Sequence, residues 1–521
     1  MSDTSDSEPI SGTTRRGGRN RHRVAAADAL PNPTYLRLRN PYPPIASLSE
    51  DEVEAIHLTS LQLLEETGMR VLHEEARAIY AKAGAKVDEG TMMVRLDRGL
   101  VMEMVAKAPP RVGLDCRNPS RNLDLGGNAL AFATVGGPPN VTDLDRGKRP
   151  GTLADFVNIV RLAQSFDVVS VISAAIEPLD VDPQLRHLDT TLVQLTESDK
   201  FPFVYARGRA VTAQAFELLR IGRGLSEAEF ASRVCCFGVI NTNSPLQLDR
   251  PMSRGIIDFA TAGQLLVITP FTLAGAMAPV SLAGALVLQN AEALAGIALA
   301  QMVRPGAPVL YGGFTSNVDM KSGAPAFGTP EYVKAAFASG QLARKYDLPW
   351  RSSATNASNA PDAQAAYETQ MSLWGAVMGG ANLVLHGAGW LEGGLTASYE
   401  KFIIDVEMLQ MFAEMFRPLK IDTAELALAA IQAVGPGGHF FGTQHTLERY
   451  KGAFYTPLVS DWTNFGAWTA AGSLDAAERA NRIWKRTLAE FASPPMDAGR
   501  REAMEDYVAR RKTEGGASLE E

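Results

Sequence analysis

Apolar residues first recur at helical spacing near residue 50, after a polar N-terminal stretch. Residues 48–68, LSEDEVEAIHLTSLQLLEETG, begin with the capping-box pattern Ser49-x-x-Glu52 and end at a glycine. The preceding segment, Asn32–Pro44, is rich in Pro and Asn and predicts an extended chain. Two further stretches show the helical spacing, Glu74–Gly84 and Asp97–Ala108. Residues 31–128 are therefore predicted to form an extended and helical lead-in.

The pattern of apolar and polar residues changes near residue 129, where short β-branched and apolar runs begin to alternate with longer amphipathic stretches. The predicted strands are Leu130–Val135, Val168–Ile176, Phe203–Arg207, Val234–Asn241, Leu265–Pro270, Val309–Thr315, Trp350–Asn356 and Asn382–Gly387. The predicted helices between and after them are Thr152–Ser165, Gln184–Glu197, Ala213–Ile221, Arg250–Gly263, Ser281–Val303, Pro330–Tyr346, Asp362–Met378 and Ser398–Phe416.

Strands that alternate with helices predict a parallel sheet with right-handed crossovers. Eight such units over residues 129–416 have the size of a closed (β/α)₈ TIM barrel, which is the α/β fold we predict. A doubly wound open sheet is the competing architecture, although no G-x-G-x-x-G follows its first strand, which disfavours dinucleotide binding. Residues 417–521 are expected to form a C-terminal extension packed on the barrel. This extension contains a glycine-rich loop, an aromatic stretch and an amphipathic helix at Asp475–Phe491.

The composition is that of a soluble globular protein. Hydrophobic residues make up 46% and charged residues 21%, and the net charge of −8 gives no whole-protein attraction for nucleic acid. Three cysteines are too few for a disulfide framework, and they favour a reducing compartment, the cytoplasm. Residues 1–30 are rich in Ser, Asp, Thr and Arg and predict a disordered tail.

One segment, Ser281–Val303, has the length of a membrane span. Gln289, Asn290 and Glu292 lie at its centre, where an acid costs about 2.5–3.5 kcal/mol on insertion. Its many Ala and Gly residues suit a helix packed tightly between other elements, so we predict a buried helix and no membrane partner.

Polar residues at the carboxyl ends of the predicted strands are the candidates for chemistry, because barrel active sites lie there. His386 ends the last strand inside HGAGWLEGG, where glycines permit close approach by a ligand. Glu392, six residues on, could hold this imidazole or face a cation. The criterion selects Asn140, Glu177, Arg207, Asn241, Asn243, Thr315, Asn356, Asn359, His386 and Glu392. From this set we assign catalytic roles to His386, Glu392 and Asn359, and substrate binding to Asn356.

Aromatic residues near the same ends could form a cage for a quaternary ammonium, each cation–π contact contributing about 0.5–2 kcal/mol. The residues assigned to substrate binding on this ground are Tyr205, Tyr311, Phe314 and Trp390. In contrast, Tyr367 and Trp374 lie seven apart on one predicted helix and are expected in the core.

No metal site is predicted from the cysteines and histidines. The spacing of His439 and His445 in GGHFFGTQH fits neither a helical pair nor a complete site, and no cysteine lies nearby. Hydrogen bonding within a loop is the favoured interpretation.

Long motifs of the chain resemble the trimethylamine:corrinoid methyltransferase family. They begin with MAPVSLAGALVLQNAEALAGIALAQMVRPGAPVLYGG at residues 277–313 and continue through GTPEYVKAAFASGQLARKYDLP, PDAQAAYE and ANLVLHGAGWLEGGLTASYEKFIIDVEML. GGHFFGTQHTL and AERANRIWKRTL complete the series, so the resemblance covers roughly residues 35–500 in order.

The resemblance implies a barrel that moves a methyl group from a methylamine to Co(I) of a separate corrinoid protein. That partner would dock over the barrel's open end and supply the cobalamin, so no cofactor is expected on this chain itself. We also expect a homo-oligomer. His386 lies where a barrel places its catalytic groups, in a loop whose glycines permit close contact. We therefore expect His386→Ala to lower methyl transfer at least about tenfold and to leave thermal stability nearly unchanged, since a glycine-rich loop carries little packing.

The chain departs from the family's namesakes at one position. Family members that demethylate trimethylamine carry pyrrolysine in the loop that here reads TNASNAP, and the position falls on Ser358 or Asn359. The chain thus resembles the members without pyrrolysine, which are similar to glycine betaine methyltransferases. A quaternary ammonium leaves as a neutral amine and needs position more than acid catalysis, whereas a neutral tertiary amine needs activation.

A quaternary amine such as glycine betaine, carnitine or proline betaine is therefore the expected methyl donor. Two alternatives stay open from the sequence. The donor could be a sulfonium, which also leaves neutral, or the protein could bind a corrinoid partner or a methylamine without catalysis.

Overall fold

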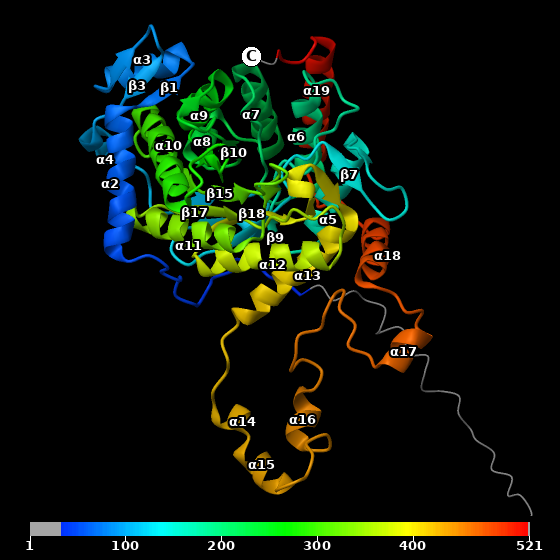
Figure 1. The fold of residues 1–521 in the computed structure, drawn as a ribbon. Coiled ribbons are helices and arrows are strands. Elements are labelled where there is room, and N and C mark those ends of the chain that lie inside the picture. The colour runs from blue at the N-terminus through cyan, green and yellow to red at the C-terminus, as the bar shows by residue number, and fades with distance from the viewer. Residues whose placement is uncertain (1–32, 519–521) are drawn as a thin grey trace, which may run out of the picture.

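The computed structural model describes residues 33–518, and its centre is a curled sheet of seven parallel strands (Figure 1). The predicted tail, residues 1–30, lies outside the described residues. In sheet order the strands are β10 (Phe237–Ile240), β12 (Leu265–Ile268), β14 (Val309–Gly312), β17 (Trp350–Ser353), β18 (Leu383–Ala388), β6 (Ala131–Thr134) and β9 (Val169–Val171). All six pairings are parallel, as the alternation of strands and helices predicts.

The remaining predicted strand, Phe203–Arg207, does not form a strand. Single parallel bridges join Val171 to Phe201 and Phe203 to Phe237, so residues 201–203 lie between β9 and β10, the two end strands of the sheet. Pro202 lacks a backbone N–H, which removes one ladder hydrogen bond from this short segment.

Side chains that point inside the curl form their own apolar cluster. Its members come from alternate positions of the strands, as the period of two requires. They include Ala131, Ala133, Val171, Phe201, Phe203, Phe237, Leu265, Val267, Leu310, Leu383 and Leu385. The opposite faces of the strands pack against the helices in the larger core cluster.

Eight helices follow the strands in the predicted order and surround the sheet (Figure 1). They are α5 (Leu153–Ser165), α6 (Arg186–Glu197), α7 (Arg209–Arg223), α9 (Arg250–Ala262), α10 (Leu282–Val303), α11 (Pro330–Lys345), α12 (Ala363–Met378) and α13 (Tyr399–Met415). Six of them begin at a Ser, Thr or Asp whose side chain accepts from the N3 backbone N–H, which satisfies one of the helix's unpaired donors: α5, α9, α10, α11, α12 and α13.

Helix α10 is the segment that has the length of a membrane span. It is the one helix of the described residues long and apolar enough to cross a membrane, and 78% of its most apolar window is buried. Gln289, Asn290 and Glu292 are all buried and hydrogen-bonded to neighbouring elements. The helix packs against the lead-in on one side and the sheet on the other, so the prediction of a buried helix agrees with this arrangement.

The lead-in contains α2 (Glu50–Glu66), α3 (Glu74–Lys82) and α4 (Arg98–Val105), which cover the outer face of α10. It also contains β1 (Met69–Val71), β2 (Lys86–Asp88) and β3 (Met93–Arg95), an antiparallel set that sequence periodicity did not predict. Strands of three residues are too short to display a period. Strand β11 (Gln247–Leu248) pairs with β1 and ties the lead-in to the rest of the molecule.

The remaining short elements lie in loops. They are β4 (Val112–Leu114), β5 (Leu123–Leu125), β7 (Asn140–Thr142), β8 (Arg149–Pro150), α8 (Glu227–Ser232), β13 (Phe271–Ala274), β15 (Phe314–Val318), β16 (Pro325–Ala326), β19 (Trp390–Leu391) and β20 (Thr396–Ser398). Several of these follow directly after a strand of the main sheet and so surround its carboxyl edge.

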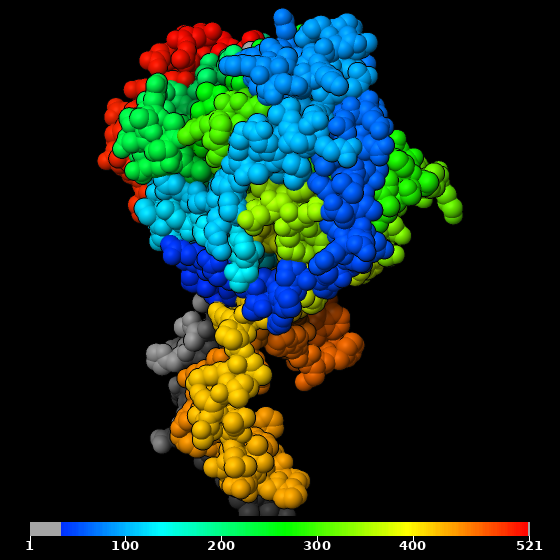
Figure 2. All heavy atoms as spheres, turned by 90° about the vertical axis from the view of Figure 1, so that its left-hand side faces the viewer, coloured from blue at the N-terminus to red at the C-terminus, as the bar shows by residue number. Residues whose placement is uncertain are grey.

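The C-terminal extension packs on the body only in part. Helices α18 (Ala476–Ala489) and α19 (Ala498–Thr513) contact α13 and α7, respectively. Between them and α13, residues 417–456 form an arm that projects away from the body in both views (Figures 1 and 2). The arm contains α14 (Thr423–Leu426), α15 (Leu428–Val434) and α16 (Gln444–Arg449), and α17 (Phe465–Ala470) follows it.

Candidate functional site

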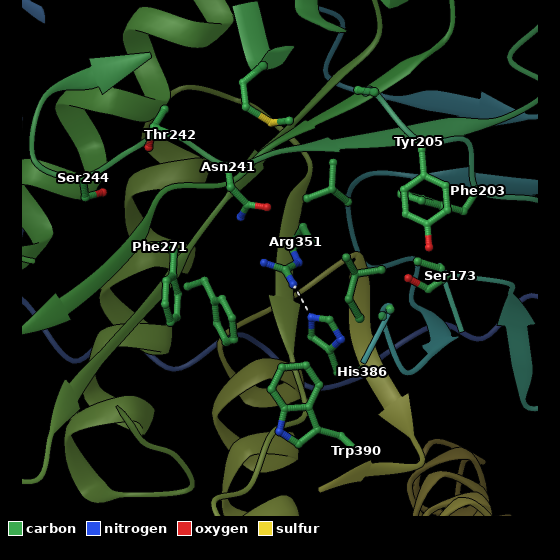
Figure 3. Close-up of a pocket in the computed structure, with 18 of the residues that line it drawn as sticks. Ser173, Phe203, Tyr205, Asn241, Thr242, Ser244, Phe271, Arg351, His386 and Trp390 are labelled. Atoms are coloured by element: carbon green, nitrogen blue, oxygen red, sulfur yellow. Dashed lines mark hydrogen bonds between the residues drawn. The ribbon is translucent and has the colours of Figure 1, made fainter. Parts of the chain in front are cut away.

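A pocket of about 560 Å³ opens at the carboxyl edge of the sheet. Side chains from the carboxyl ends of the strands and from the loops that follow them converge on it (Figure 3). This position agrees with the expectation that chemistry lies at the carboxyl ends of the strands. Of the ten polar residues selected there from the sequence, four line the pocket: Arg207, Asn241, Asn243 and His386.

His386 enters the pocket because strand β18 is irregular. Its pairing with β6 shifts register between Val384 and Ala388, and the backbone of His386 has φ 60°, a left-handed conformation that is strained for a non-glycine residue. As a result both Leu385 and His386 line the pocket, although neighbours in a regular strand point to opposite faces.

The imidazole of His386 is neutral. Burial lowers its pKa well below the usual value, and the nearby guanidinium of Arg351 lowers it further. Arg351 Nη2 lies 3.1 Å from His386 Nε2, and since a guanidinium only donates, Nε2 must accept. The proton of the neutral ring is therefore on Nδ1, which has no hydrogen-bond partner among the described residues.

Arg351 is the residue that the sequence criterion missed. It lies within β17 on the inner face, and its side chain is fully buried beside His386 (Figure 3). Nη2 donates to Ser353 Oγ at 2.7 Å, while Nε and Nη1 have no partner among the described residues. Burial lowers its pKa to about 10, since no carboxylate of the described residues pairs with it. A buried guanidinium without a counter-ion is a site for an anion.

Aromatic rings form two walls of the pocket. On one side the Phe314 ring contacts Phe271, Phe327 and Trp390, with centroid distances of 5.0, 5.5 and 6.4 Å. Trp390 also lies 4.3 Å from the His386 ring. The opposite wall contains Phe203 and Tyr205, at 4.9 Å from each other (Figure 3). The pocket thus offers several π faces around a space that borders two guanidinium groups, Arg351 and the Glu177-paired Arg207.

Tyr205 is fixed in place by a charged network behind the wall. Its hydroxyl donates to Glu177 Oε2 at 3.2 Å, and the same carboxylate pairs with Arg207 and Arg186. Burial opposes ionisation of Glu177, but the two guanidinium groups outweigh it and lower its pKa. Glu177 is thus neutralised in the wall, and it does not offset the charge of Arg351.

A loop after β10 forms a third side of the pocket with hydroxyl and amide groups. Asn241 donates its amide to the Thr269 carbonyl at 3.0 Å, and its side chain points into the pocket (Figure 3). Thr242 and Ser244 also line it, and both donate to the buried carboxylate of Glu292 on α10. Glu292 therefore fixes this loop from beneath.

Two of the predicted site residues lie behind the pocket wall. Asn356 donates its amide to the Trp390 carbonyl at 2.6 Å, and the Trp390 indole N–H donates to the Asn356 carbonyl at 3.0 Å. Asn356 therefore orients Trp390 and is not one of the lining residues. Glu392 pairs with Lys148 at 2.6 Å and accepts from Thr396, outside the pocket. Burial would raise its pKa, but these two contacts lower it.

Tyr311 also lies elsewhere than predicted. Its neighbour Leu310 points inside the curled sheet, so Tyr311 points outward and its hydroxyl donates to Asn290 Oδ1 on α10 at 3.0 Å. The ring is fully buried in the interface between β14 and this helix. Of the residues predicted for substrate binding, the structure brings Tyr205, Phe314 and Trp390 together with His386, but not Tyr311 or Asn356.

A family profile described as trimethylamine methyltransferase matches residues 15–516. The glycine betaine methyltransferase of Desulfitobacterium hafniense (strain Y51) is 36% identical over 471 residues, which cover 90% of this chain and 98% of that protein. A trimethylamine methyltransferase of Desulfitobacterium hafniense (strain DSM 10664 / DCB-2) is 31% identical over 454 residues, 87% of this chain and 91% of that protein. The chain belongs to the trimethylamine methyltransferase family. A crystal structure of the Methanosarcina barkeri monomethylamine methyltransferase aligns over 89% of this chain and 95% of its own, with 10% identity and a TM-score of 0.47.

These relatives confirm the family and the enzyme class predicted from the sequence: the protein is a methyltransferase. They leave the roles of the individual residues as predictions. His439 and His445 lie in the arm, far along the chain from the pocket residues, and no group of three or more His, Cys, Asp or Glu side chains within residues 33–518 is arranged to hold a metal.

The loop of the methyltransferase that corresponds to the pyrrolysine position does not enter the pocket. Ser358 is buried, and its hydroxyl oxygen lies 3.0 Å from both the Ala360 carbonyl and Asp362 Oδ1, the two acceptors that its one proton can serve. Its carbonyl accepts from the Glu392 N–H at 2.7 Å. Asn359 is exposed at the outer side of this loop and is not a lining residue. The catalytic role predicted for Asn359 therefore has no support in the geometry.

The buried histidines predict how the stability of the methyltransferase depends on pH. Burial lowers the pKa of His57, His73, His187 and His386 below 6.5, so below that pH the unfolded chain binds more protons than the folded one. Their contribution to stability is present above pH 6.5 and is lost as the pH falls towards the folded-state values.

We therefore expect the free energy of unfolding, measured with urea, to fall from pH 7 to pH 5. In His386→Asn the slope over this range should be smaller by up to about 1.4 kcal/mol per pH unit, the contribution of one proton. An unchanged slope in this variant would mean that His386 titrates normally.

Proposed function

We propose that this methyltransferase takes a methyl group from a betaine, a quaternary ammonium that carries a carboxylate, and gives it to Co(I) of a corrinoid protein. The observation that carries the proposal is the buried guanidinium of Arg351 within a wall of aromatic rings, with no carboxylate partner and two unbonded donors among residues 33–518. A simple cation would be repelled by this charge at short range. A zwitterion can place its anionic end beside this guanidinium and so balance its charge.

The carboxylate end of the substrate fits beside Arg351 and His386. Nε and Nη1 of Arg351 and Nδ1 of His386 are buried donors without partners among the described residues. Hydrogen bonds to a charged group are worth about 1.5–3 kcal/mol each, and the neutral tautomer of His386 keeps its N–H available for one of them. The Arg351 guanidinium already lies 5.2 Å from the centre of the Phe314 ring, so the ammonium end lies further away, against Trp390 or the opposite wall.

The chemistry needs no acid from the protein. The Co(I) electron pair forms a bond to the methyl carbon as the C–N bond breaks, and the nitrogen retains that bonding pair. The substrate's positive charge disappears, so the amine leaves neutral, and the cobalt becomes methyl-Co(III). The residues of this chain bind, orient and exclude water, which suits a pocket whose polar groups are concentrated at one end.

The acceptor is a separate protein in this proposal. The cobalamin is a substrate carried by a corrinoid partner that docks where the pocket opens, at the carboxyl edge of the sheet. We further infer that the fold is a complete eight-membered barrel with residues 201–203 as the third member. The parallel bridges of this segment to β9 and β10 support this inference. The three buried thiols support a reducing, cytoplasmic setting.

A panel of methyl donors tests the proposal through the absorbance of methyl-Co(III), with Co(I) cobalamin as acceptor. Glycine betaine or a related betaine should react. Tetramethylammonium, which lacks the carboxylate, should have a kcat/KM at least about 100-fold lower, and trimethylamine should be similarly poor because its leaving group is not neutral. Equal rates with tetramethylammonium and betaine would overturn the role of the carboxylate. Reaction with a sulfonium alone would assign the other class of donor.

A further inference from the structure

The arm, residues 417–456, has no core of its own. None of its three helices, α14, α15 and α16, contains a buried residue, and every residue of the arm is among those that the structure describes. Ten large apolar side chains of the arm are exposed, among them Phe441 and Phe454 at 85% each. They are Leu419, Ile421, Leu426, Leu428, Ile431, Phe440, Phe441, Leu447, Tyr450 and Phe454. A segment of this kind keeps a fixed structure only if another surface covers it.

The body presents a second unpartnered apolar surface next to the root of the arm. Tyr367, Met371 and Trp374 follow one another at helical spacing on the outer face of α12, and Tyr367 is 59% exposed. Met411 of α13 is also exposed. The ring of Trp374 on α12 lies 5.2 Å from the ring of Phe412 on α13. We call this surface the α12–α13 patch. Its exposure contradicts the expectation that Tyr367 and Trp374 belong to the core.

The arm begins on the edge of the sheet opposite to the pocket. Leu130, directly before β6, donates its N–H to the Leu38 carbonyl, so the segment after Leu38 lies at the amino ends of the strands. From the same segment Tyr42 donates to the carbonyl of Met415, the last residue of α13. The arm follows two residues later (Figure 1). A protein that delivers cobalt to the pocket approaches the other edge.

We propose that a second copy of this chain covers the arm, with the arm of each copy lying on the α12–α13 patch of the other. A corrinoid partner must leave after every methyl transfer, whereas the arm needs permanent cover. Both surfaces belong to one chain and adjoin each other at the arm's root, so a twofold axis makes the two contacts equivalent and closes the dimer.

The available area is that of a stable dimer. At about 150–250 Å² for each buried aromatic side chain, the four rings of the arm offer on the order of 500 Å² in their present exposure. Six aliphatic side chains add a similar amount, and reciprocal contact doubles the total. This exceeds the roughly 1,600 Å² that a standard stable interface buries.

Light scattering on the purified protein tests the proposal first. The wild-type chain should have the mass of a dimer, or of a multiple of it, at micromolar concentration. The double variant Phe441→Ser/Phe454→Ser should halve that mass and raise the dissociation constant of the dimer at least about 100-fold. The thermal unfolding temperature of the body should stay unchanged. Leu58→Ser is the matched control, because Leu58 is an exposed apolar residue of α2. A monomeric wild type, or an oligomer that the arm variant leaves unchanged, would overturn the proposal.

Cross-linking identifies the surface that the arm covers. The native cysteines are all buried, so chains carrying Phe441→Cys can be mixed with chains carrying Met371→Cys and treated with a short bismaleimide. We expect a covalent product that contains one chain of each kind, and none with Leu58→Cys in place of Met371→Cys. Amide hydrogen exchange should show that the arm of the wild-type protein is protected when no other protein is present. Protection that appears only after a corrinoid protein is added would assign the arm to that partner and overturn the dimer.

Discussion

Replacing Arg351 with methionine should remove most betaine turnover and leave the protein at least as stable as the wild type. The guanidinium is buried without a counter-ion in the part of the chain that the structure describes, and burial already lowers its pKa to about 10. Losing an ionic hydrogen-bonding partner of a buried carboxylate costs about 3–5 kcal/mol, so kcat/KM for a betaine should fall about 10³-fold. The same change removes an unpaired charge from the interior, so the free energy of unfolding should rise, by on the order of 1 kcal/mol.

Two variants make this result specific. Arg351→Lys keeps a charge but loses the planar fork, and we expect it to recover only part of the activity. Arg344→Met is the control: Arg344 is an exposed arginine of α11, away from the pocket, and donates to the Gly379 carbonyl at 2.7 Å. It should lose stability and keep its kcat/KM. Urea unfolding beside the methyl-Co(III) assay measures both quantities. Full betaine activity in folded Arg351→Met would sink the proposed carboxylate site.

The parts of the fold that the sequence predicted are those with a long, regular pattern. Seven of the eight predicted strands pair in one parallel sheet, and each predicted helix is present, because apolar runs and amphipathic stretches of this length have few alternatives. Residues 203–207 failed as a strand, since Pro202 interrupts the hydrogen bonding before them. The small sheet of the lead-in was missed because its strands have three residues each.

The site was predictable in position but only partly in its residues. The strand-end criterion found His386, and the aromatic criterion found Tyr205, Phe314 and Trp390. The prediction that Tyr311 binds substrate failed because side chains alternate along β14: Leu310 points inside the sheet, so Tyr311 points towards α10. Alternation along the strand would also have pointed to Arg351: in WRSSAT residues 351, 353 and 355 share one face, and all three are polar, whereas the other face carries Trp350, Ser352 and Ala354.

The exposed aromatics mark a different limit of sequence reasoning. Tyr367 and Trp374 share a helical face, and such a face is buried against some surface. Periodicity does not tell whether that surface belongs to the same chain. The aromatic residues of the arm pose the same question, since they have no apolar partner within the arm's own helices.

The variant His386→Asn should lower kcat/KM for a betaine about 100-fold, on the order of 2.7 kcal/mol. Asparagine tolerates the left-handed backbone at φ 60°, so the change removes the ring without forcing the strand to move. It removes one of the two acceptors of Arg351 Nη2 together with the Nδ1–H that has no partner among the described residues. Stability should also fall, by about 1–2 kcal/mol, because the ring is buried 4.3 Å from Trp390. This prediction replaces the sequence-based expectation of nearly unchanged stability, because the structure packs the ring against Trp390.

A double-mutant cycle separates a role at the substrate from a purely structural one. If Arg351 and His386 hold the same carboxylate, then His386→Asn should have much less effect on kcat/KM in the Arg351→Met background, since the shared ligand is already lost. If the two substitutions instead lower kcat/KM by factors that multiply, then His386 does not act through the carboxylate that Arg351 holds. Wild-type kcat/KM in the folded single variant would remove it from the site. Raising the pH to 8 should restore activity to neither variant. The imidazole that remains in Arg351→Met is already neutral at pH 7, and His386→Asn has no imidazole.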